Sequence, residues 1–159
     1  MDIRPNLQFS VLCDDVRRED NGKFMLIGLF EAINAKEFPA THPALFVVNR
    51  WCKGEGEFTQ KIRIINSKDS SVVFQTDEQR FQLQDLEAHH TLVSKFGNLH
   101  FPDPGKYWLA QAWIPLTVRT TWKNCIRSST FCGPDRSTSG RCSEIVLRLR
   151  SRTDKPNSR

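Results

Sequence analysis

The chain has 159 residues, of which 38% are hydrophobic, and a formal net charge of +5. This length fits one domain of ordinary size, which can bury a core without disulfide or metal staples. No run approaches the roughly 20 apolar residues that a membrane helix needs, and the first ten residues lack the pattern of a secretory signal. The sequence therefore predicts a cytoplasmic protein without a membrane segment.

The first predicted element is a strand over residues 6–16, because apolar residues alternate there with Gln8 and Ser10. A period of two is typical of a half-buried strand. The turn signal DNG at 20–22 follows, and KFMLIGLF at 23–30 is apolar on both faces, as in an interior strand. The charges at 17–20 are therefore interpreted as the solvated tip of a hairpin.

Short strands with turn signals between them continue along the chain. Pro39 and Pro43 predict a turn or crossover, and no segment shows a sustained period of 3.6 residues. Eight or nine such strands predict an all-β fold, a two-sheet antiparallel β-sandwich over residues 5–118. The further predicted strands are 31–38 (weak), 44–52, 57–66, 72–75, 80–84, 90–101 and 106–114.

The last third of the chain has a different composition. Residues 1–108 carry a net charge of −2 and residues 109–159 a net charge of +7. Residues 119–159 are rich in Arg, Ser, Thr and Cys, and only Glu144–Arg150 has the pattern of a strand or short helix. We expect this segment to be a mostly disordered basic tail. It is either an inert extension or an arm that contacts nucleic acid or another polyanion.

The stretch VLCDDVRREDNGKFMLIGLF, followed by FPATHPALFVV, resembles a bacterial family of small β-sandwich proteins of unknown function. The resemblance covers residues 7–108 and rests on a start motif L-C-D-D-V-R-x-E-x-x-G-K. It implies a two-sheet sandwich that ends with a P-G-x-Y strand, a short Asp-Gly turn and one closing strand. It carries over no catalytic residues.

The chain departs from this pattern after Trp108, where LAQAWIPLTVRTTWKN stands in place of a strand and an Asp-Gly turn. Charge, cysteine content and periodicity all change within a few residues. One hypothesis is that the reading frame changed near residues 108–110, so that the tail was not selected to fold with the sandwich. Reading the other frames of the gene would test this.

Several side chains could in principle bind metal or act in catalysis. Asp14, Asp15 and Asp20 could bind Ca²⁺, which takes six to eight oxygen ligands. A metal-dependent hydrolase would require Asp14 or Asp15 to meet His89 or His90 in one pocket. Neighbouring strand residues point to opposite faces, so neither the aspartate pair nor the histidine pair is expected to converge. We predict no metal site and no catalytic residue.

The five cysteines give no strong motif. Cys13 and Cys52 lie in apolar strands, where they are expected to be unreactive. The spacing of Cys125, Cys132 and Cys142 does not match a zinc site. The sequence therefore favours a non-enzymatic binding or interaction module without a cofactor, one that could self-associate through an open sheet edge.

Overall fold

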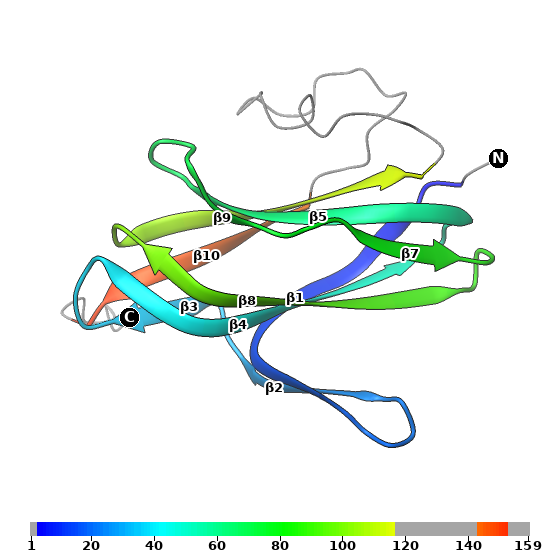
Figure 1. The fold of residues 1–159 in the computed structure, drawn as a ribbon, viewed down its shortest axis with the longest axis horizontal. Coiled ribbons are helices and arrows are strands. Elements are labelled where there is room, and N and C mark those ends of the chain that lie inside the picture. Colours follow the sequence, from blue (N-terminus) through cyan, green and yellow to red (C-terminus); the bar gives the residue numbers. More distant parts are fainter. Residues whose placement is uncertain (1–2, 117–142, 153–159) are drawn as a thin grey trace, which may run out of the picture.

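The computed structural model describes residues 3–116 and 143–152, and the predictions that fall on 117–142 and 153–159 lie outside the described residues. The described chain forms two stacked sheets and no helix (Figure 1). The all-β sandwich is therefore confirmed. Its strands are β1 (Asn6–Arg18), β2 (Phe24–Leu29), β3 (Ala32–Ala35), β4 (Ala40–Cys52), β5 (Gly56–Asn66), β6 (Val72–Gln75), β7 (Gln79–Leu83), β8 (His89–Phe101), β9 (Gly105–Pro115) and β10 (Ser143–Ser151).

One sheet has four strands in the order β2-β1-β4-β8, and the other has the order β3-β10-β9-β5-β6, with β7 also paired to β5. The described residues thus contain ten strands, where eight or nine were predicted. All neighbours are antiparallel except β3 and β10, which are parallel. The expectation of a purely antiparallel sandwich is corrected at this one pair.

β10 is a second correction, which concerns where this segment lies. Glu144–Arg150 had the pattern of a strand or short helix within the tail, and it does form a strand, but one that inserts between β3 and β9. Leu147 and Leu149 point into the core and are buried, whereas Arg148 and Arg150, which alternate with them, are exposed. The six-stranded sheet therefore takes a strand from the segment beyond residue 118.

The prolines give a third correction. Residues 38–43 were predicted to be a turn, but β4 already starts at Ala40 and contains Pro43. In this part β4 pairs only with β8, because its ladder with β1 starts at Phe46. Proline has no backbone N–H, so a strand tolerates it where that side of the strand has no neighbouring strand to receive a hydrogen bond.

The core lies between the sheets in two apolar clusters. The larger one contains Leu45, Ile62, Phe96 and Leu109, and the smaller one is aromatic, with Trp51 stacked on Phe81. The alternating residues of β5 fill both clusters, as their period predicted. The burial of these side chains, at about 1.5–3 kcal/mol each, is the main stabilising contribution to the fold.

A chain of buried polar side chains lies between the clusters. The Gln60 amide oxygen accepts hydrogen bonds from Asn49 Nδ2 at 3.0 Å and Trp51 Nε1 at 2.7 Å. Its Nε2 donates to Gln79 Oε1 at 2.9 Å, and Ser94 Oγ donates to the same oxygen at 2.7 Å. These bonds join β4 and β8 of one sheet to β5 and β7 of the other, so they fix how the two sheets face each other.

Candidate functional site

The charges at 17–20 lie at the tip of the β1–β2 hairpin, as predicted. Asp15 Oδ2 forms an ion pair with Arg17 Nε at 3.2 Å, and both side chains are largely exposed. Lys23 N donates to Asn21 Oδ1, which closes the turn. An exposed pair of this kind contributes about 0–1 kcal/mol to stability. The tip is therefore a solvated turn held by its own polar groups.

The two aspartates before the tip do not converge. The carboxylate of Asp14 packs over Gly28 on β2, whereas that of Asp15 accepts from Val16 N and pairs with Arg17. Asp20 lies in the exposed turn. Within residues 3–116 and 143–152, no three His, Cys, Asp or Glu side chains gather as metal ligands would.

His89 and His90 lie at the other end of the four-stranded sheet from Asp14. His89 pairs with Cys52 of β4, which pairs with Asn6 at the start of β1. Asp14 is eight residues further along β1, or roughly 25 Å at about 3.3 Å per residue. The ring of His90 lies 5.8 Å from that of Phe81 and closes the aromatic cluster. The structure thus does not bring His89 or His90 to Asp14 or Asp15.

Two further candidate surfaces lie at the β2 edge of the four-stranded sheet. The first is the arm, which we define as residues 14–29. Its β1 half pairs only with β2, because the β1–β4 ladder ends at Cys13, and the arm extends away from the two layers (Figure 1). A two-stranded hairpin is only marginally stable in water unless something packs on it.

The arm exposes apolar side chains on an edge strand. β2 was predicted to be an interior strand, but it is the outermost strand of its sheet. Phe24, Met25 and Leu29 are 41%, 46% and 64% exposed. Edge strands in soluble proteins are usually protected by charges or proline, and β2 contains neither over its six residues.

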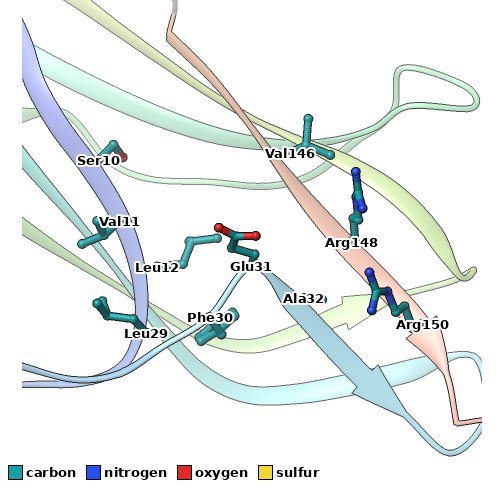
Figure 2. A pocket seen from close by; sticks show the side chains of 10 residues that line it. All are labelled: Ser10, Val11, Leu12, Leu29, Phe30, Glu31, Ala32, Val146, Arg148 and Arg150. Carbon is teal, nitrogen blue, oxygen red and sulfur yellow. The ribbon is translucent and has the colours of Figure 1, made fainter. Parts of the chain in front are cut away.

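The second feature is a groove of about 810 Å³ beside the base of the arm (Figure 2). Its walls come from three segments: β1, the crossover between β2 and β3, and β10. The residues that line it are Ser10, Val11, Leu12, Leu29, Phe30, Glu31, Ala32, Val146, Arg148 and Arg150.

The β1 wall of the groove is the edge of a strand. Three consecutive residues, Ser10 to Leu12, line it, although neighbouring side chains of a strand point to opposite faces. β2 covers this edge only from Cys13 onward, and Phe30 N donates to Leu12 O where the chain crosses to the other sheet. Among the described residues, no strand pairs with this side of β1 over residues 7–11.

The β10 wall is a face of alternating residues, Val146, Arg148 and Arg150, which project from the same side of the strand (Figure 2). Neither guanidinium forms an ion pair with any residue in the described part of the chain. The one carboxylate in the groove lining, that of Glu31, lies between β1 and β10. The groove therefore combines two cations, one anion and an apolar wall.

The groove also touches the buried polar chain. Ser10 Oγ donates to Asn49 Oδ1 and accepts from Gln111 Nε2, both at 2.5 Å. Gln111 is fully buried, and its Oε1 has no partner among the described residues. A buried acceptor of this kind calls for a donor such as an internal water.

The cysteines of the described residues do not add a reactive site. Cys13 and Cys52 are free thiols and are buried. Burial, and to a lesser extent the nearby carboxylates of Asp14 and Asp15, raises the pKa of the Cys13 thiol. A raised pKa leaves less thiolate, which is the nucleophilic form. The other three cysteines lie outside the described residues, as do most of the basic residues expected to contact a polyanion.

Sequence reasoning missed the groove because its residues are far apart in the chain. Glu31 is separated from Arg148 by more than one hundred residues, and only the parallel pairing of β3 with β10 brings them together. The available signal was the alternation in Glu144–Arg150, which favours a strand and places both arginines on one face.

Among the described residues, the fold and these surfaces define a two-sheet β-sandwich with an open edge and a lateral groove. A model of a family of unknown function, DUF6941, matches residues 8–111. The chain belongs to this family, which confirms the resemblance carried by the start motif. No curated protein matches the chain. The described residues contain no helix that is both long and apolar enough to cross a membrane.

Proposed function

We propose that the protein is a non-enzymatic interaction module, formed by residues 5–118 together with β10, that self-associates through the edge of β2. The observation that carries this proposal is the mismatch between the sequence of β2 and its position. A strand that is apolar on both faces is expected to have neighbours on both sides, but the described chain supplies only β1.

A second copy of the same chain fits this edge. Lys23 precedes β2 and Glu31 follows it, so antiparallel pairing of two β2 strands places the basic end of each beside the acidic end of the other. Such an interface is isologous and closed, as in most soluble homodimers. Pairing also covers Phe24 and Met25, which are exposed in the single chain. The buried free thiols of Cys13 and Cys52 support a reducing compartment, the cytoplasm.

The test is the oligomeric state of the full chain by light scattering coupled to size exclusion. We expect a concentration-dependent dimer, and we expect Met25→Lys to shift it to monomer because a charge on an edge strand opposes pairing. Val72→Lys is the matched control, since Val72 is also 46% exposed and lies on β6, at the edge of the other sheet. A wild-type protein that stays monomeric, or a dimer that Met25→Lys leaves intact, contradicts the proposal.

A further inference from the structure

We propose that the groove binds an extended acidic peptide, which adds as a strand to the free edge of β1 and places its carboxylates on Arg148 and Arg150. This ligand site adjoins the β2 edge through which the protein is proposed to self-associate, because Leu29 of β2 also lines the groove, but its ligand is a peptide and not a second copy of the chain. It rests on three properties of the groove: a backbone edge and two guanidinium groups that have no strand or ion-pair partner among residues 3–116 and 143–152, and an apolar wall.

The backbone edge comes first. Over residues 7–11, β1 pairs with β4 on one side, and no described strand continues β2 on the other side, because the chain crosses to β3 after Leu29. Five strand residues offer a binding length of about 16 Å. An exposed edge whose N–H and C=O groups point outward is the template that extended peptides use in β-strand addition.

The arginines supply the chemical preference. Arg148 and Arg150 are two residues apart on one strand, so their Cα atoms lie about 6.6 Å apart along it. The side chains of an extended peptide repeat at the same interval on each face, so carboxylates at alternate positions match the two guanidinium groups. Arginine binds carboxylates in a bidentate manner and with strict geometry.

The other lining residues determine how the bound peptide is oriented in the groove. Leu29, Phe30 and Val146 form an apolar surface that suits the small hydrophobic side chains on the peptide's other positions. Glu31 lies between β1 and β10 (Figure 2) and repels carboxylates at the crossover end. Because Arg148 N donates to Glu31 O at 3.2 Å, this repulsion acts close to Arg148 and favours a carboxylate at Arg150, which lies further along β10.

The experiment measures binding of a fluorescein-labelled heptapeptide of alternating valine and aspartate to the full-length protein by fluorescence anisotropy. We expect the acidic peptide to bind, with an affinity that falls as salt is added, and a peptide of alternating valine and lysine not to bind. The double variant R148E/R150E should lose at least about tenfold in affinity, because like charges placed opposite each other across an interface oppose binding. Arg80→Glu, at an exposed arginine on β7, should leave the affinity unchanged.

Two further peptides test the strand addition itself. They carry N-methyl groups on the odd or on the even residues, which removes backbone donors while keeping the charges. Loss of binding in at least one of them supports pairing with β1. Three outcomes would overturn the proposal. They are binding of both N-methylated peptides with the affinity of the parent peptide, no binding of the parent peptide to the wild-type protein, and unchanged binding of the parent peptide to R148E/R150E. Binding to basic residues elsewhere in the chain would survive both changes. The N-methyl comparison uses wild-type protein, so it remains decisive if the double variant fails to fold.

Discussion

Gly28 shows how a single residue sets the geometry of the arm. Its φ is +68°, and a Cβ there would lie 3.0 Å from the Asp14 Cγ atom. An alanine would be strained in this conformation. We expect Gly28→Ala to lower the free energy of unfolding by about 1–2 kcal/mol, measured by urea denaturation. Gly97→Ala is the control, because the nearest atom to its Cβ would be 3.9 Å away. Equal effects of the two substitutions would contradict this account.

Gln60 is the central residue of the buried polar chain, with three hydrogen-bond partners. Replacing it by leucine leaves the Asn49 amide and the Trp51 indole N–H buried without an acceptor. We expect Gln60→Leu to destabilise the protein by about 3 kcal/mol or more, since each buried polar group left unpaired costs about 1–3 kcal/mol. The comparison is Gln82→Leu on β7, where the side chain is exposed. A Gln60→Leu protein as stable as wild type would show that the polar chain contributes no net stability.

Two buried groups predict sensitivity to alkali. Burial raises the pKa of Tyr107 above its ordinary value of 10.0, and burial with nearby carboxylates raises that of Cys13 above 9.0. A folded-state pKa above the unfolded value gives a contribution to stability that is complete below the unfolded pKa and is lost as pH rises. The free energy of unfolding should therefore fall from about pH 9 upward.

The substitution Tyr107→Phe isolates the tyrosine part of this effect. Tyr107 Oη donates to Asp103 O at 2.7 Å, so its loss should cost about 1 kcal/mol at pH 7. Between pH 8 and pH 10.5, the free energy of unfolding of the variant should then fall less than that of the wild type, measured by urea denaturation in the presence of a reducing agent. Parallel curves for the two proteins would rule out a contribution from Tyr107 ionisation.

At the level of elements, β10 connects β3 to the rest of the six-stranded sheet. Leu147 is fully buried in the larger apolar cluster, and β10 is the only strand of the described chain that joins β3 to β9. We expect Leu147→Ala to lower stability by about 2–4 kcal/mol, measured by thermal and urea unfolding. Val146→Ala on the opposite face should cost less than about 1 kcal/mol, because surface substitutions have small effects. If the two costs are similar, β10 does not pack as described.

Other elements could be predicted to different extents, for physical reasons. The β1–β2 hairpin and β5 follow from a period of two and from turn residues, which are local signals. The edge position of β2 was missed because its apolar pattern resembles that of an interior strand. The early start of β4 was missed because Pro43 is a poor strand residue unless one side of the strand is free. Local patterns predict a strand better than they predict its neighbours.

At the scale of the whole molecule, the fold class followed from the sequence but the groove did not. Alternation specifies which face of each strand is buried, and this is enough for two stacked sheets. The groove depends on the register between β1, β3 and β10, which local patterns do not encode. A metal-dependent hydrolase would have required Asp14 and His89 in one pocket, but the two residues lie near opposite ends of the four-stranded sheet.

The whole-molecule view also bears on the reading-frame hypothesis. Residues after 110 fit the core: Gln111 is fully buried and Trp113 packs edge-on against Phe58. With β10 in the sheet, part of the chain beyond the suspected point folds with the sandwich. The family match, however, ends at residue 111, close to the suspected point. The hypothesis therefore stays a prediction: a strand pair joined by an Asp-Gly turn in another frame of the gene would support it, and its absence from all frames would rule it out.

The sheet order β3-β10-β9 has a consequence for synthesis on the ribosome. β10 is translated last of the three, yet it occupies the middle position. Until residues 143–151 leave the exit tunnel, β9 lacks one neighbour and β3 has none in its sheet. The nascent chain therefore carries an unfinished sheet until β10 is made, and a ribosome stalled before Ser143 holds a chain in which the edges of β3 and β9 that face β10 are both unpaired.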